Sequence, residues 1–138
     1  MNTYDPSQIS VIVGGAVISG FADGTFVNAA RNEDAFTYVP SSTGGGTRTK
    51  NANKSGRVTL TLQKTSESNE VLDNYADLDE KSNEGIFSIL IRDNNGKDLH
   101  KGESAWIVKK PDSEESKELP NREWIIEVAE LEMNVKGA

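Results

Sequence analysis

The sequence contains no cysteine and a single histidine, His100. The absence of cysteine excludes disulfide bonds, thiolate metal sites and cysteine nucleophiles. One histidine cannot build a metal site of several imidazoles. His100 stands in a polar connection, so we predict that it is a surface residue, and we expect neither a metal nor a cofactor.

Long apolar runs are also missing. No stretch of the 138 residues is long and apolar enough to cross a bilayer, and the N-terminus lacks the basic-then-apolar pattern of a secretory signal. We therefore expect no membrane contact. A hydrophobic content of 35% is enough for one modest core, and the length suits one domain spanning residues 1–138.

No pattern of catalytic residues stands out. The acids of the chain would need a cleft that separates their pKa values before they could act as a pair, and the sequence indicates none. The glycines in "GGGTRTK" at 44–50 are consecutive, whereas a phosphate-binding loop spaces them and precedes a helix. We predict that the protein is not an enzyme and has no catalytic residues.

Charge is distributed unevenly along the chain. Residues 1–65 hold six basic and four acidic residues (net +2), and residues 66–138 hold nine and eighteen (net −9), which together give the overall −7. No acid lies between Asp34 and Glu67. This pattern fits either a solvated loop beside an acidic body or two complementary patches that meet on different subunits.

Alternating apolar residues predict a mainly β protein. Residues 9–13 and 16–22 are predicted to form a hairpin closed by two glycines, and 26–32 a further strand, with 35–39 as its expected extension past a break. "RVTLTLQKT" at 57–65 has one apolar face and one polar face. Further strands are expected at 86–92, with an Asn95-Gly96 turn after it, at 104–109 and at 123–137, where a change of parity predicts a bulge near Ala129.

One helix and one long loop complete this prediction. Ser66 is the expected N-cap of a helix that extends to about Glu80 and covers one side or end of a sheet. Residues 40–56 are predicted to be a long loop, and 1–8 a flexible arm. The fold class is therefore an antiparallel β-sandwich or partly closed barrel of about seven or eight strands with one α-helix.

Several stretches resemble a known family. They are "TYDPSQISVIVGGAVISGFADGTFV", then "RNEDAFT" and "NKSGRVTLTLQKTSESNEVL". Together they are similar to the opening of tail-tube subunits of contractile-tailed bacteriophages, and the similarity covers roughly the first eighty residues. The resemblance implies hexameric rings that stack into a hollow tube, through which DNA passes.

The resemblance also implies partners and a location. A sheath protein surrounds such a tube, a tape-measure protein fills it during assembly, and baseplate and tail-terminator proteins bind its ends. The protein would belong to the phage tail and be assembled in the cytoplasm of the host bacterium.

Three sets of residues follow as candidate assembly sites. The first is a basic segment in the inter-ring loop: Arg48, Lys50, Lys54 and Arg57. The second is the acidic set that would receive it: Glu70, Asp73, Asp77, Glu114 and Glu115. The third is the candidate lumen wall on the polar face of 57–65: Thr59, Thr61 and Gln63. In the neighbouring strand, either Asn28, Ala30 and Asn32 or Ala29, Arg31 and Glu33 could share that wall.

Two alternatives stay open at this point. A small β-sandwich module of a phage particle that binds a ligand or carbohydrate would use Trp106 and Trp124 as a platform, although apolar neighbours favour a core position for both. A hydrolytic enzyme at the tip of the particle would need a titratable cleft.

Overall fold

The computed structural model describes residues 3–94 and 97–135. Its main sheet is antiparallel, in the order β2-β1-β7-β8-β9-β6-β3. The bounds of these seven strands are β1 (Ile9–Val13), β2 (Ala16–Ile18), β3 (Val27–Arg31), β6 (Gly56–Gln63), β7 (Phe87–Asp93), β8 (Lys97–Lys109) and β9 (Asn121–Val128). The predicted Asn95-Gly96 turn lies outside the described residues.

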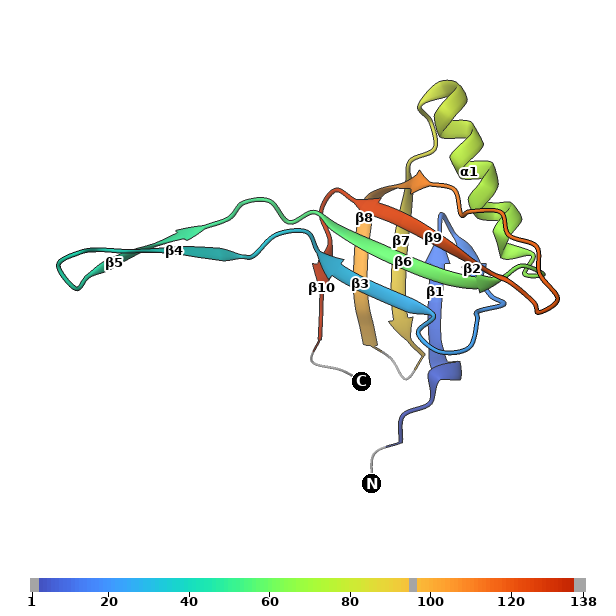
Figure 1. Cartoon of the computed structure of the whole chain (residues 1–138), viewed down its shortest axis with the longest axis horizontal. Coiled ribbons are helices and arrows are strands. Elements are labelled where there is room, and N and C mark those ends of the chain that lie inside the picture. Colours follow the sequence, from blue (N-terminus) through green and yellow to red (C-terminus); the bar gives the residue numbers. More distant parts are fainter. Residues whose placement is uncertain (1–2, 95–96, 136–138) are drawn as a thin grey trace.

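The sheet folds over itself, so that its two halves enclose one core (Figure 1). In that view β3, β6 and β9 cross in front of β1, β7 and β8. Buried side chains from both halves, such as Val11, Ile91, Leu60 and Ile126, belong to a single cluster. The sheet ends at β2 and β3, and a bridge between Phe21 and Leu62 links the chain after β2 to β6 without closing a barrel.

The change of parity predicted near Ala129 is confirmed. β9 ends at Val128, Ala129 and Glu130 are exposed, and Leu131 is again buried. The chain then forms β10 (Glu132–Met133), which pairs with the N-terminal part of β8, whereas β9 pairs with its C-terminal part. The long strand β8 therefore pairs with both β9 and β10. The break after Val128 allows one continuous stretch of sequence to form these two strands.

The helix α1 (Ser68–Ser82) packs against β8 and β2 and buries Leu72 and Ala76 in the core. It begins one residue later than predicted, because Glu67 rather than Ser66 takes the N-cap position, although Ser66 Oγ still accepts from Ser68 N at 3.2 Å. It ends where Asn83 takes a left-handed conformation (φ 59°).

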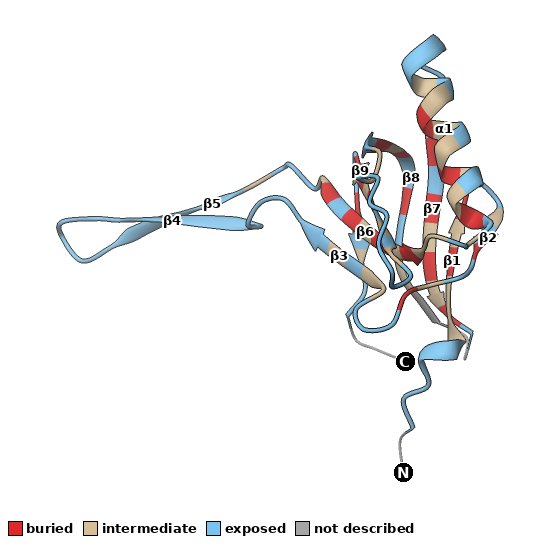
Figure 2. Ribbon diagram, turned by 45° about the vertical axis from the view of Figure 1, so that its right-hand side comes forward, coloured by how far each residue is buried: buried red, intermediate tan, exposed pale blue. Residues whose placement is uncertain are grey.

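The largest difference from the predicted fold lies in residues 40–56. In place of an irregular loop, β4 (Phe36–Pro40) and β5 (Gly46–Lys50) form a two-stranded hairpin that projects far from the sheet (Figure 1). We call it the arm. Its tip turns at Gly44, whose positive φ of 95° favours glycine. Figure 2 shows the arm exposed along its length, while buried residues are confined to the body.

Three smaller predictions were also wrong. The strand expected over 16–22 stops at Ile18. The strand expected at 104–109 begins at Lys97, which places His100 inside β8 and leaves it only half-buried rather than on the surface. The described residues thus hold ten strands, against the predicted seven or eight, because of the arm and β10.

Candidate assembly surfaces

The predicted lumen wall is the outer face of one half of the sheet. Val58, Leu60 and Leu62 are fully buried on the inner face of β6, so Thr59, Thr61 and Gln63 face outward and are half-buried. The pairing of β3 with β6 decides which residues of β3 lie on the same face as Thr59. Asn28 is opposite Thr59 and Ala30 is opposite Arg57. Asn28, Ala30 and Asn32 therefore share this face, which we call the threonine face. Ala29 pairs with Val58 and points inward.

One cation on the threonine face is neutralised within the chain. Arg57 Nε donates to Glu127 Oε2 at 2.8 Å, and Asn32 Nδ2 donates to the other carboxylate oxygen at 2.5 Å. The Glu127 side chain is 17% exposed and that of Arg57 53% exposed. Glu127 therefore presents a shielded carboxylate to Arg57 on β6 and to Asn32, which directly follows β3. Neither Glu127 nor its role emerged from the sequence, since only the strand register brings residue 127 opposite residue 57.

The acidic loop after β8 borders the same face. A shallow hollow of about 390 Å³ is lined by Thr61 together with Glu114 and Glu123 and by Lys109, Lys110 and Asp112. Lys64 donates to Glu115 from the end of β6. Glu114 and Glu115, which were predicted to form one surface with the helix acids, therefore lie at the edge of the threonine face.

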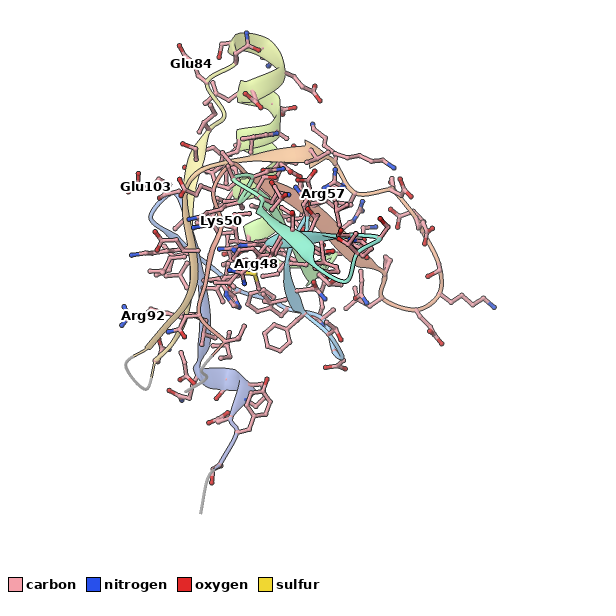
Figure 3. All side chains as sticks on the ribbon, turned by 90° about the vertical axis from the view of Figure 1, so that its left-hand side faces the viewer. Arg48, Lys50, Arg57, Glu84, Arg92 and Glu103 are labelled. Atoms are coloured by element: carbon pink, nitrogen blue, oxygen red, sulfur yellow. The ribbon has the colours of Figure 1, made fainter. Side chains whose placement is uncertain are left out.

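The predicted basic segment is divided between elements. Arg48 and Lys50 lie on β5 of the arm, and Lys54 lies in the connection back to the body, where its carbonyl accepts from Leu131 N at 2.9 Å. Arg57 belongs to β6 (Figure 3). Of the four predicted residues, the arm therefore carries two.

Two of the predicted acids of α1, Asp73 and Asp77, are already paired within the chain, whereas Glu70 is exposed in the first turn of the helix. Asp73 and Asp77 lie one turn apart, and Lys110 Nζ is 3.0 Å from Asp73 Oδ1 and 2.6 Å from Asp77 Oδ1. The hydrogen bond from Lys110 holds the pKa of Asp77 below its ordinary value, and the same bond raises the pKa of Lys110. This face is therefore less negative than its sequence implies.

This cluster predicts a pH dependence. A carboxyl group whose pKa is depressed in the folded state contributes stability above its ordinary pKa of 3.8, and the contribution is lost as the pH falls through the folded value. We expect Lys110→Gln to lower the urea midpoint slightly at pH 7, with the difference from wild type disappearing in strong acid. Lys117→Gln, with the same loss of charge in the exposed loop, is the control. An unchanged midpoint at pH 7 would show that the bridge adds nothing.

The tryptophans do not form a ligand platform. Trp124 is buried, as predicted, and its Nε1 donates to Asn69 Oδ1 at 2.9 Å. Trp106 is half-buried opposite Glu127 on the outer face. Because one indole is in the core, the arrangement required by the carbohydrate-binding alternative is absent.

The part of the chain that the structure describes offers neither a metal-binding cluster nor a membrane-spanning helix. Among residues 3–94 and 97–135, no three histidine, aspartate or glutamate side chains are grouped so as to hold a metal ion. Burial lowers the pKa of His100. No helix in the described part of the chain is both long and apolar enough to span a bilayer.

Solved structures similar in fold belong to contractile injection systems. A chain of the extracellular contractile injection system PVC sheath-tube complex in its extended state matches with a TM-score of 0.62 at 14% identity, covering 96% of this chain and 91% of that one. A chain from the PVC sheath/tube terminator in its extended state matches with a TM-score of 0.57 at 13% identity, covering 98% of this chain and 99% of that one. A chain from the cap that terminates the anti-feeding prophage tube matches with a TM-score of 0.58 at 12% identity, covering 97% of this chain and 92% of that one. These likenesses establish the fold.

Sequence comparison establishes the family. "Structural protein ORF10" of Pseudomonas phage KPP10 is 33% identical over 133 residues, which cover 91% of this chain and 77% of that protein. The family model of the bacteriophage PhiTE tail tube protein matches residues 1–136. The resemblance drawn from the first eighty residues thus extends over nearly the whole chain. This chain belongs to the PhiTE family of phage tail tube proteins, and it is a structural protein rather than an enzyme.

Proposed function

We propose that copies of this chain assemble into hexameric rings that stack into the hollow tube of a contractile phage tail. The observation that carries this proposal is the arm, an exposed hairpin that this chain's own sheet does not cover. A two-stranded hairpin alone is at best marginally stable in water. A neighbouring copy, in the same ring or the next, would supply the missing contacts.

The sheath, tape-measure, baseplate and tail-terminator proteins are the proposed partners, with assembly in the host cytoplasm. Two of the solved relatives come from particles described as a sheath-tube complex and a sheath/tube terminator. These descriptions support a tube role for this chain. A terminator role would be compatible with the same fold.

Electron microscopy of the purified protein over a concentration series tests the assembly proposal. We expect hollow rings at low concentration and tubes at high concentration. Rings that never stack would favour a terminator over a repeating tube subunit. A field of monomers that persists after addition of purified baseplates would overturn the proposal.

We further propose that the threonine face lines the channel through which DNA passes. Free lysines and arginines on a channel wall would hold phosphates with an affinity that depends on salt. On this face Thr59, Thr61 and Asn28 are uncharged, and Arg57 is neutralised by Glu127. Such a wall would let DNA slide.

This proposal predicts an effect of Glu127→Gln. The substitution leaves Arg57 unpaired, and in a ring the change is repeated in every copy. We expect tubes assembled in the presence of labelled DNA to retain severalfold more of it on sedimentation, with retention falling as salt rises. Glu80→Gln, which removes an equivalent charge from the exposed side of α1, should not increase retention. Equal retention by both variants would contradict the proposal.

A further inference from the structure

The arm has two chemically different faces, set by the register of β4 and β5. Phe36 is directly opposite Lys50, and Tyr38 is opposite Arg48, so these four side chains share one face. Threonines and Val39 occupy the other face. The Arg48 guanidinium carbon lies 4.2 Å from the centroid of the Phe36 ring, a cation–π contact. We call this side of the hairpin the aromatic face of the arm.

The aromatic face is exposed in the single chain. Tyr38 is 64% exposed and Phe36 is 44% exposed, and β4 and β5 pair with each other rather than with the main sheet. The arm points away from the body (Figure 1), so its own chain does not cover it. A surface that covers this face should offer apolar contact for two rings and negative charge for two cations.

The outer face of β7 and β8 offers both. A hollow of about 520 Å³ lies there, with Leu90 and Ala129 contributing apolar surface, and with Glu103, Glu130 and Glu132 among the lining residues. We call it the β7–β8 hollow. Lys101, 3.6 Å from Glu132, is its one lining cation, which leaves a formal charge of −2 to face the +2 of Arg48 and Lys50. Figure 3 shows Glu103 at the edge of the body.

An apolar row extends from this hollow across the sheet. Leu90 is opposite Ile12 on β1, and Ile12 is opposite Val17 on β2. Val17 is 65% exposed, and the other two are half-buried. Aromatic rings stack well on such a row of branched side chains in neighbouring strands. The acids Asp73 and Asp77 of α1 are a weaker receptor, because Lys110 already pairs with both.

We propose that the aromatic face of the arm docks in the β7–β8 hollow of a second copy. This inference rests on the proposed self-assembly and names the surface through which it occurs. Arg48 and Lys50 face Glu103 and Glu130 of the neighbour, while Phe36 and Tyr38 cover Leu90 and the adjoining apolar row. Opposite charges set the orientation, and the buried apolar area supplies most of the affinity.

A charge exchange tests the pairing. Glu103→Lys with Glu130→Lys should abolish tubes in electron micrographs, and adding Arg48→Glu with Lys50→Glu to the same chain should restore them. Circular dichroism confirms that each variant folds. As a control with the same charge change, Glu70→Lys with Glu80→Lys on α1 should leave assembly intact. If the wild type forms tubes and the hollow variant does so equally well, this inference fails while the proposed function stands; if the wild type never assembles, the proposed function fails first.

Cross-linking locates the contact directly, because the sequence contains no cysteine. A tagged Tyr38→Cys chain mixed with an untagged Ser104→Cys chain should give a heterodimer with a short bismaleimide reagent. Thr37→Cys, on the opposite face of the arm, is the matched control and should give much less of this product. Preferential cross-linking of Tyr38→Cys to Asn74→Cys on α1 would place the arm on the helix and overturn the inference.

Discussion

Replacing Arg48, Lys50 and Lys54 together by glutamate is expected to abolish tube formation without unfolding the chain. Arg48 and Lys50 are exposed on the arm and Lys54 is exposed at its base, so none of them supports the core. In the proposed contact, reversing Arg48 and Lys50 changes an attraction into a repulsion against Glu103 and Glu130 of the neighbour. Like charges placed against each other across an interface cost several kcal/mol. Sedimentation of the polymer and electron microscopy measure the loss.

The control for this experiment carries the same charge change elsewhere. Glutamate at Lys81, Lys109 and Lys117 also alters three exposed lysines by the same total charge, but on α1, at the end of β8 and in the loop after it. Tubes should still form in this variant. If both triple variants lose assembly equally, net charge rather than the arm governs stacking. Unchanged polymer length in the arm variant would contradict the role given to the arm.

The second large effect is expected from Leu72→Ala in α1. Leu72 is fully buried and belongs to the same cluster as Val13, Phe87 and Ile107. Truncating a buried leucine to alanine removes its transfer free energy and leaves a cavity, which together lower the free energy of unfolding by about 2–5 kcal/mol. We expect a correspondingly lower urea midpoint, because the helix covers one end of the core.

Leu78→Ala provides the matched control. It is the same substitution in the same helix, but Leu78 is 43% exposed, so we expect a loss well below that of Leu72→Ala. Because alanine favours the helix at least as much as leucine does, equal losses would show that Leu72 is packed no more tightly than Leu78. That result would contradict the placement of α1 as part of the core.

The elements predicted most accurately are those whose side chains alternate or repeat clearly. In "RVTLTLQ" the buried valine and leucines mark every second position of β6, so both its strand character and its two faces could be read from the sequence. The change of parity around Ala129 likewise predicted a bulge at the point where the structure has the break between β9 and β10. In α1, Leu72 marked the buried side. In each case the core enforces the periodicity that the sequence displays.

The arm could not be predicted in the same way. β5 reads Gly-Thr-Arg-Thr-Lys and has no apolar residue, and all of its side chains are exposed. Because β5 has no buried face, its sequence lacks the alternation of apolar and polar residues that marks a strand. The neighbouring glycines indicate a loop instead. What defines β5 is its pairing with β4 across a short turn. Its two threonines are favourable for a strand, but that preference alone was too weak to distinguish hairpin from loop.

Prediction of the assembly surfaces from the sequence was limited, because they depend on contacts between residues far apart in the chain. Glu127 meets Arg57 across 70 positions, and Lys110 meets Asp77 across 33. The sequence has many acids in the second half of the chain. It does not show which of them pair with a cation of the same chain and which remain available to another copy. Strand register and the path of the loop after β8 decide this, and both are set by packing of the whole sheet.

The most direct test of the account is a cryo-electron microscopy reconstruction of the assembled tube. The account predicts that Thr59, Thr61 and Gln63 line the channel and that the arm of each copy lies on the β7–β8 hollow of a neighbour. A map in which α1 or the outer face of β1 and β7 lines the channel, with the arm free of contacts to other copies, would contradict it.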